Sequence, residues 1–261
     1  MRSVSKQLIA AFLATQLVAL FVGYQFLSQE VSIVENPEDA GNAVRFFIQI
    51  LVSTAVLLLV LHFYKGKRLF QAVEYLLEFS AIQIFASLFV SAEYSLAAAI
   101  ALVGLRILAP DLKMFFLLFA TAVVGGLLGA SLGIVPAILL SALLAIYDVY
   151  AVFGSKHMIV LAKQMQERGA AFAVHLNDKK KKESITLGTG DVVIPAMIVV
   201  SSIRLSDSLL PAAFALIGAV AGLMAMIYVL EKNKCYWPAL PPLVFGSLSF
   251  LVAYMAIAFF F

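Results

Sequence analysis

The sequence has few charged residues and only one cysteine. Charged residues make up 13% of the 261 positions and hydrophobic residues 63%, whereas soluble domains contain about 25% charged and about 45–50% apolar residues. This composition excludes a soluble globular domain, a disordered chain and a nucleic-acid-binding protein, whose basic residues would gather on one polar face. The single cysteine, Cys235, excludes an internal disulfide and a thiolate metal cluster. The length allows one membrane domain, because each spanning helix takes about 20 residues.

Long apolar runs predict an all-α polytopic membrane protein with nine transmembrane helices. The runs show no period-two alternation, so strands are not expected, and backbone groups in lipid must form hydrogen bonds within their own segment. The first run is interpreted as a retained helix and not a signal peptide, because it is long and lacks a small-residue cleavage site. The predicted spans are 7–28, 43–64, 71–91, 94–109, 112–132, 135–155, 185–204, 208–230 and 238–260.

Basic residues lie almost entirely at one end of these predicted helices. With alternating spans, 16 of the 18 Lys and Arg residues fall on the side of the N-terminus, and only Arg45 and Arg204 fall on the other. Because cytoplasmic loops are rich in Lys and Arg, we expect the N-terminus inside and the C-terminus outside the cytoplasm. The long loop 156–184, with its four-lysine run, is then cytoplasmic, either as a solvated linker or as a surface for anionic lipid or a charged substrate. It separates a six-helix part, 1–155, from a three-helix part, 185–261, within one integral membrane domain.

Most acidic residues fall in loops or near helix ends, but Asp148, in the sixth predicted span, and Asp191, near the start of the seventh, do not. An acid at membrane depth costs at least about 2.5–3.5 kcal/mol on insertion scales, so both are functional candidates. Counted at 1.5 Å per helical residue, both lie roughly 10 Å below the cytoplasmic face, and consecutive helices are usually neighbours. The two carboxyl groups are therefore expected to meet and to share one proton, because two buried like charges at close range are unfavourable.

Two carboxyl groups that share one proton are suited to hydrolysis by activated water. The ionised group removes a proton from the water that attacks a peptide carbonyl, and the protonated group donates to the carbonyl oxygen. No metal and no other cofactor is expected. His62, His157 and His175 fall at or outside the predicted cytoplasmic boundary and lack metal-ligand spacing.

The residues around Asp191 favour an accessible backbone. Gly188 and Gly190 allow another chain to approach closely, and Pro195 cannot donate the usual helical hydrogen bond to the carbonyl of Asp191. The helix is therefore expected to be loosened or to begin here, which is tolerated only beside protein or a water-filled cavity. In the last span, the three prolines within 237–242 predict an irregular helix start at the depth of both acids.

Three short motifs resemble those of the presenilin and signal peptide peptidase family of intramembrane aspartyl (GxGD) proteases. They are Tyr147-Asp148, Leu187-Gly188-Thr189-Gly190-Asp191 and Pro238-Ala239-Leu240, on the sixth, seventh and ninth predicted spans. The resemblance implies an endopeptidase that cuts in or near transmembrane helices, with Asp148 and Asp191 as the catalytic pair. It implies further that the active site is shaped by Tyr147, Leu187, Gly188 and Gly190, and that substrate is bound by Pro238, Ala239 and Leu240.

The resemblance also bears on origin and partners. The small size indicates a microbial, archaeal homologue in the cell membrane, and the charge bias gives the orientation of presenilin. The loop 156–184 is short compared with that of presenilin, so obligatory cleavage within it is not expected, and accessory subunits are not expected either. The expected partners are the lipid bilayer and transmembrane helical substrates.

Two other functions remain open from the residues alone. The same acids could serve as a relay in a proton- or cation-conducting protein, or the chain could be a non-catalytic scaffold that binds helices. Neither alternative explains the tyrosine, the glycine pair and the Pro-Ala-Leu segment together.

Two further features predict packing inside the chain. Glu78 of the third span is expected either to stay near the lipid headgroups or to meet Arg106. Glycines at intervals of four residues favour close approach of helices, and they are Gly125, Gly129 and Gly133 in the fifth span and Gly218 and Gly222 in the eighth.

Overall fold

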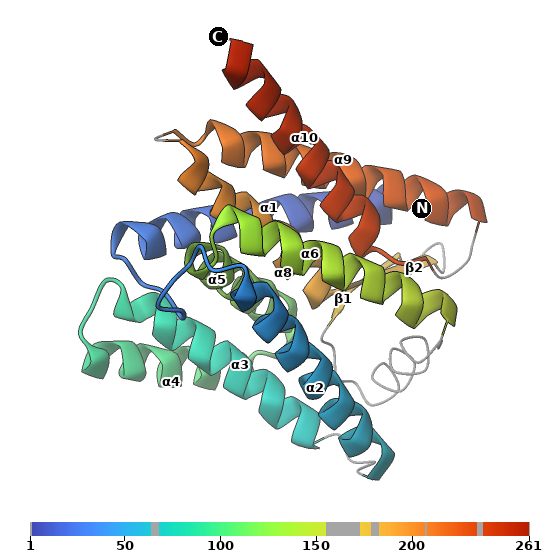
Figure 1. The fold of residues 1–261 in the computed structure, drawn as a ribbon. Helices are drawn as coiled ribbons and strands as arrows, with labels where there is room; N and C mark the ends of the chain where they lie inside the picture. Colours follow the sequence, from blue (N-terminus) through green and yellow to red (C-terminus); the bar gives the residue numbers. More distant parts are fainter. Residues whose placement is uncertain are drawn as a thin grey trace.

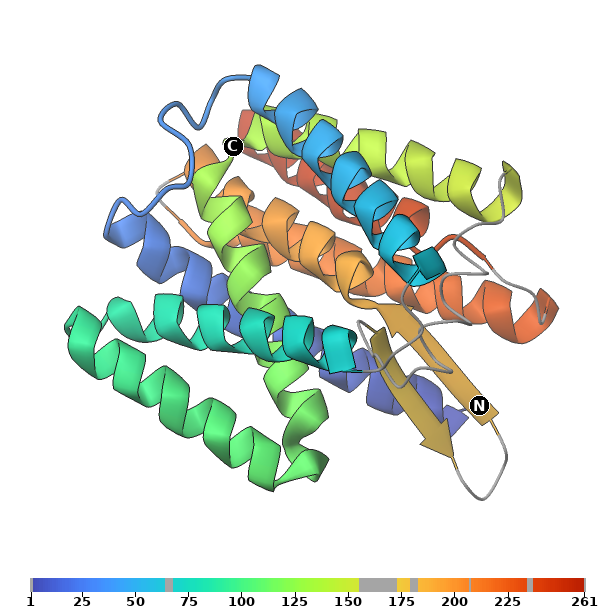
Figure 2. The ribbon, with the colours of Figure 1, turned by 90° about the horizontal axis from the view of Figure 1, so that it is seen from below.

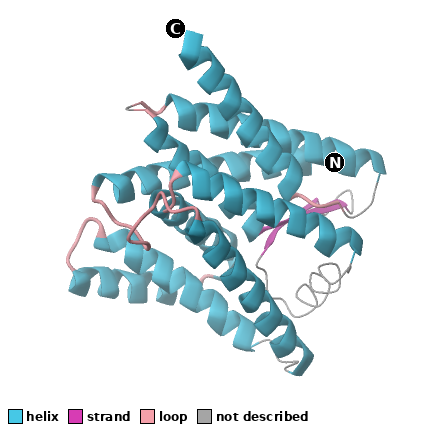
Figure 3. Cartoon of the chain, in the orientation of Figure 1, coloured by secondary structure: helices cyan, strands magenta, loops and turns pink. Residues whose placement is uncertain are grey.

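The computed structural model describes residues 2–63, 68–154, 173–178, 183–206, 208–233 and 237–260. Within these ranges the chain forms nine α-helices and one short β-hairpin (Figures 1 and 3). The helices are α1 (Arg2–Ser28), α2 (Gly41–Phe63), α3 (Arg68–Ser87), α4 (Ala92–Leu108), α5 (Lys113–Ser131), α6 (Ile134–Val149), α8 (Thr189–Ser201), α9 (Leu210–Asn233) and α10 (Leu240–Phe260). Shorter helical turns are η1 (Pro110–Leu112), η2 (Tyr150–Gly154) and η3 (Ser202–Leu205).

Each described helix matches one predicted span, but two helices are short. Seven segments of the described chain are long and apolar enough to cross a membrane, which makes the chain a multi-pass integral membrane protein. The other two helices are α4, with 17 residues, and α8, with 13, whereas a spanning helix needs about 20. That all nine helices cross the bilayer therefore stays a prediction.

The short helix α8 lies at the centre of the bundle, in contact with α1, α5, α6, α9 and α10 (Figure 1). Every residue from 194 to 202 is buried. A helix that is apolar on all sides is typical of a core helix. Because α8 is surrounded by protein, its length is not set by the thickness of the lipid.

Close packing around α8 and α10 depends on glycines, as predicted. A Cβ atom at Gly125 or Gly129 of α5 would press on α8, and one at Gly218 or Gly222 of α9 would press on the backbone of α10. Gly133 is an exception, because it lies beyond the end of α5, where a Cβ would meet the loop between α1 and α2. The prediction of internal helix packing is therefore confirmed for the two glycines of α5 and the two of α9, and it is wrong for Gly133.

A β-hairpin precedes α8, and the prediction that the chain has no strands is wrong here. Strand β1 (Ala173–Asp178) pairs antiparallel with β2 (Glu183–Gly188). The seventh predicted helix therefore begins at Thr189 and not at residue 185. β-branched residues such as Ile185 and Thr186 favour extended backbone, and the pairing satisfies the backbone groups that a helix would otherwise have satisfied.

The hairpin lies beside the N-terminal part of α1 (Figure 2). It occupies part of the predicted basic loop 156–184 and the first residues of the predicted seventh span. The remainder of that loop, with the four-lysine run 179–182 and His157, lies outside the described residues, as does Cys235.

Hydrogen bonds join several connections at the opposite end of α1. The N–H of Gly133, before α6, donates to the carbonyl of Pro37 at 2.8 Å, and Gln29 donates to a carbonyl of the turn after α3 at 3.1 Å. Arg204 of η3 donates to the carbonyl of Ala130, near the end of α5, at 2.6 Å. These bonds gather connections that the alternating topology places on one side of the membrane.

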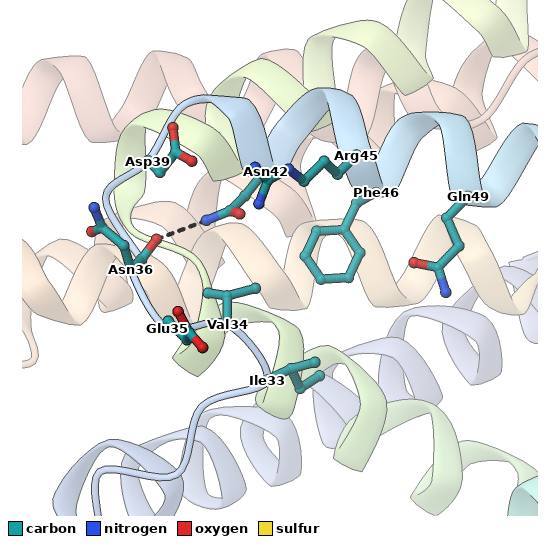
Figure 4. A pocket seen from close by; sticks show the side chains of 9 residues that line it. All are labelled: Ile33, Val34, Glu35, Asn36, Asp39, Asn42, Arg45, Phe46 and Gln49. Carbon is teal, nitrogen blue, oxygen red and sulfur yellow. Dashed lines mark hydrogen bonds between the residues drawn. The ribbon is translucent and has the colours of Figure 1, made fainter.

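A pocket of about 600 Å³ opens at this same end, between the α1–α2 loop and α2 (Figure 4). The buried Asn42 amide donates to the carbonyl of Asn36 at 2.7 Å across its rim. The pocket lies near the start of α6, whereas Asp148 lies in the last turn of that helix. It is therefore separate from the candidate site described below.

Ion pairs around two buried glutamates join α3, α4 and α5. The Nε atom of Arg106 lies 3.1 Å from Oε2 of Glu78, and Nζ of Lys113 lies 3.0 Å from Oε1 of Glu74. The Arg106 guanidinium also lies over the ring of Tyr75, 4.7 Å from its centroid. Of the two expectations for Glu78, contact with Arg106 is confirmed.

Candidate active site

Asp148 lies in the last turn of α6, and its carboxyl group contacts the start of α10. Its Oδ2 accepts a hydrogen bond from the N–H of Leu240 at 3.2 Å, and the N–H of Ala239 also interacts with the carboxyl group. Leu240 is the first residue of α10. Since the first N–H groups of a helix lack partners within the helix and favour an acidic group, Asp148 caps α10 from a neighbouring helix.

Prolines limit the number of donors at this helix start. Pro241 and Pro242 have no N–H, so Leu240 is the only one of the first three residues of α10 that can donate. Proline is well tolerated at the first positions of a helix. The Pro238-Ala239-Leu240 segment therefore lies at the level of Asp148, as expected from the sequence, and presents the amides of Ala239 and Leu240 to it.

Asp191 is the third residue of α8, and its carboxyl group reaches back to the start of that helix. Its Oδ2 accepts a hydrogen bond from the N–H of Gly188 at 3.2 Å, as in one half of a capping box. A Cβ at Gly188 would lie 3.0 Å from the same oxygen, so glycine leaves room for the carboxylate. Gly190 is exposed, and a Cβ placed there would meet no atom within 4 Å. The backbone beside Asp191 is thus accessible, as predicted.

The two carboxyl groups come from adjacent helices of the bundle. Helix α6 contacts α8, and both contact α10. Both Asp148 and Asp191 are partly exposed. The estimate of equal depth treated residues 184–188 as helical, which is wrong, because these residues form a strand that rises about 3.3 Å per residue. Helices α6 and α8 nevertheless pack together, and contact between the two carboxyl groups stays a prediction.

The other residues that the motifs point to occupy different surroundings. Tyr147 packs edge-on against Phe47 of α2, with ring centroids 6.4 Å apart. Leu187 is 2% exposed and packs in an apolar cluster that includes Val192. Pro238 is buried near the start of α10. Tyr147 thus lies on α6 beside Asp148 and contacts α2, whereas Leu187 packs near the start of α8.

Two features near the acids were not foreseen from the sequence. After Asp148 the helix widens into the π-helical turn η2, a distortion that is frequent at functional sites. The amide of Gln16 on α1 donates to the carbonyl of Val192, one residue after Asp191, at 2.9 Å. A glutamine inside an apolar run is a signal that could have drawn attention to α1.

The fold and these contacts define a polytopic membrane protein with two partly exposed aspartates on adjacent helices of its bundle. The family model for signal-peptide peptidase, presenilin aspartyl protease matches residues 9–259, and the chain belongs to this family. It is therefore a hydrolase of the intramembrane-cleaving aspartic type, which confirms the resemblance seen in the motifs.

Solved structures of this family share the fold. A presenilin family intramembrane aspartate protease, solved in space group C222, is 25% identical to this chain, with a TM-score of 0.72 and coverage of 97% of this chain and 99% of that one. A presenilin family intramembrane aspartate protease solved in space group P2 is also 25% identical, with a TM-score of 0.67 and coverage of 94% of this chain and 96% of that one. Comparison with curated protein sequences gives no match.

Proposed function

We propose that Asp148 and Asp191 form the catalytic pair that activates water to hydrolyse peptide bonds in or near transmembrane helices. The observation that carries this proposal is that two partly exposed aspartates lie on adjacent, packed helices, and that each carboxyl group accepts a hydrogen bond from a backbone N–H. The ionised carboxyl takes a proton from water as the water oxygen attacks the peptide carbonyl, and the protonated one donates to the carbonyl oxygen. Collapse of the tetrahedral intermediate then breaks the C–N bond.

The substrate must be unwound where it is cut, because a helix holds its carbonyls in hydrogen bonds to residues four positions ahead. An extended substrate segment is expected to pair as an added strand with β2, which ends at Gly188 beside the exposed Gly190. In this arrangement Tyr147, Leu187 and Gly188 shape the site. The segment Pro238-Ala239-Leu240 contributes to substrate binding from the side of α10.

Cleavage by the purified chain in proteoliposomes tests this proposal. A model transmembrane peptide is expected to be cut without accessory subunits, and mass spectrometry of both products locates the broken bond. A peptide with a hydroxyl isostere in place of that bond is expected to inhibit, since it resembles the tetrahedral intermediate. A chain that neither cuts the peptide nor binds the isostere would contradict the proposal and favour a scaffold.

Leu240→Pro is expected to lower kcat about 10- to 150-fold relative to Leu240→Ala. The proline removes the Leu240 N–H that donates to Asp148 and leaves that of Ala239 in place, and hydrogen bonds to charged groups contribute about 1.5–3 kcal/mol. Proline is tolerated at the first position of a helix, so α10 is expected to remain. The measurement is the rate of peptide cleavage at saturating substrate.

Leu240→Ala is the matched control for this substitution. It also removes the buried leucine side chain, which is 5% exposed, but it keeps the amide donor. Equal rates for the two variants would show that the Leu240 side chain matters and the hydrogen bond to Asp148 does not.

We also propose that all nine helices cross the membrane, with the N-terminus in the cytoplasm. The hydrogen bonds among the α1–α2 loop, the turn after α3, the α5–α6 turn and η3 support the alternation. Cys235 is the only cysteine and falls on the cytoplasmic side. A membrane-impermeant thiol reagent is therefore expected to label it in inside-out vesicles and not in intact cells.

The complementary variant is Glu35→Cys in a Cys235→Ser background. Glu35 is exposed in the α1–α2 loop, and its replacement is expected to be labelled in intact cells. The reverse pattern for the two cysteines would overturn the orientation, and labelling of both from one side would overturn the odd number of spans.

A further inference from the structure

Gln16 is a fully buried amide in the middle of α1, at 0% exposure. Its Nε2 donates to the carbonyl of Val192 at 2.9 Å, while its Oε1 has no hydrogen-bond partner in the described part of the chain. One turn away on either side, Phe12 and Ala19 pack in apolar clusters with residues of α8. An apolar residue of similar shape would fill this space without leaving a buried acceptor unpaired, so packing alone does not account for the glutamine.

The bond from Gln16 is made at the turn of α8 that carries Asp191. Pro195 has no N–H, so the carbonyl of Asp191 has no donor four residues ahead in its own helix. The first turns of α8 therefore hold fewer internal bonds than an ordinary helix. Gln16 supplies a donor from another helix at Val192, the next residue.

We propose that Gln16 is a positioning residue that fixes the Asp191 turn against α1. A single polar contact in an apolar interface sets the register of two helices, because sliding of α8 would leave the amide and the carbonyl unpaired. This proposal rests on the proposed catalytic role of Asp191. It adds a residue of the first helix, more than 170 positions earlier in the chain, to the machinery that orients the carboxyl group.

Gln16→Met keeps the length of the side chain and removes the amide. Its kcat is expected to fall about tenfold, the effect of about 1.4 kcal/mol on a barrier, with KM little changed, because Gln16 holds a carboxyl group that acts on the reacting bond. Thr15→Val is the matched control. Thr15 is also buried on α1, but its hydroxyl donates within its own helix, to the carbonyl of Ala11 at 2.8 Å, so its kcat is expected to stay within about twofold.

A double-mutant cycle with Pro195→Ala separates positioning from packing. Alanine restores an N–H four residues after Asp191, so the turn depends less on Gln16. Gln16→Met is then expected to lower kcat less than about threefold in the Pro195→Ala background. Equal losses in both backgrounds would overturn the positioning role.

The thermal unfolding midpoint in detergent is measured for each variant beside its rate of cleavage, to show that the variant is folded. If Gln16→Met does not yield folded protein, Gln16→Asn takes its place, since its amide is one methylene too short to reach Val192. Wild-type kcat in that variant, or a loss of activity that only follows the loss of folded protein, would overturn the inference. If the wild type cuts the peptide and Asp191→Asn does not, these outcomes concern Gln16 alone and leave the proposed function standing.

Discussion

Asp191→Asn is expected to lower the rate of cleavage of a reconstituted transmembrane peptide by about 10²–10⁴-fold, the contribution of a general acid or base. Asparagine has the shape of aspartate, and its carbonyl oxygen can still accept the hydrogen bond from Gly188. It can neither remove a proton from water nor deliver one to a carbonyl oxygen. The same loss is expected for Asp148→Asn, whose amide oxygen can still accept from Leu240.

The two substitutions together are expected to cost little more than either alone. Groups that act as a unit show strongly non-additive effects, because the remaining carboxyl group cannot support the reaction alone. Asp111→Asn is the control, since Asp111 is exposed in η1 and is expected to change the rate less than about twofold. Turnover near the wild-type rate in either single variant would defeat the assignment of the pair.

A transport function makes a different forecast for the same protein. If the acids formed a relay, Asp191→Asn would abolish proton or calcium flux in liposomes. The wild type would then cut no peptide, or the substitution would not change its rate of cleavage. Measuring flux and cleavage on one preparation therefore distinguishes the two functions. The family to which the chain belongs favours cleavage.

The acid pair could be predicted because its signals are local. An aspartate inside an apolar run is conspicuous, and the neighbours of Asp148 and Asp191 carry recognisable motifs. The helices were likewise predictable, because long apolar segments between polar turns leave few alternatives in a membrane. The content of each helix was thus predictable, whereas the equal depth of the two aspartates rested on a helical count that strand β2 contradicts.

The start of α8 was predicted incorrectly because no polar loop separates strand β2 from the helix that follows it. Residues 183–188 continue into the apolar helix through Gly188, which caps α8. The strand forms because β1 pairs with it, and such pairing is not visible in the segment itself. The length of α8 escaped prediction for a related reason: protein neighbours bury it, so the usual requirement of about 20 residues does not apply.

Contacts between distant residues were the least predictable part of the site. The bond from Leu240 to Asp148 links positions 92 apart, and the bond from Gln16 to Val192 links positions 176 apart. The sequence marks Gln16 and the start of α10 as unusual, but it does not give the partner atoms, since each contact depends on how helices are arranged. Glu78 and Arg106 were easier, because opposite charges at one end of consecutive helices of a hairpin are natural partners.

Arg106→Met is expected to destabilise the folded protein by about 3–5 kcal/mol, the usual effect of breaking a buried ion pair by removal of one partner. Glu78 is fully buried, and without Arg106 it would lose its cation at 3.1 Å. The thermal unfolding midpoint in detergent is expected to fall by roughly 6–20 °C. Arg68→Met is the control, because Arg68 is exposed at the start of α3 and its loss is expected to cost less than about 0.5 kcal/mol.

A second substitution distinguishes the stranded charge from lost packing. Adding Glu78→Gln to Arg106→Met removes the uncompensated charge and is expected to restore more than about half of the lost stability. Failure of this rescue would show that Arg106 matters through its packing over Tyr75.

Since the α3–α4 hairpin joins the rest of the described chain mainly through α5, the arrangement of α6, α8 and α10 is expected to persist below the lowered midpoint. Arg106→Met is therefore expected to keep kcat within about threefold while it is folded, whereas Asp191→Asn is expected to keep its fold and lose its activity.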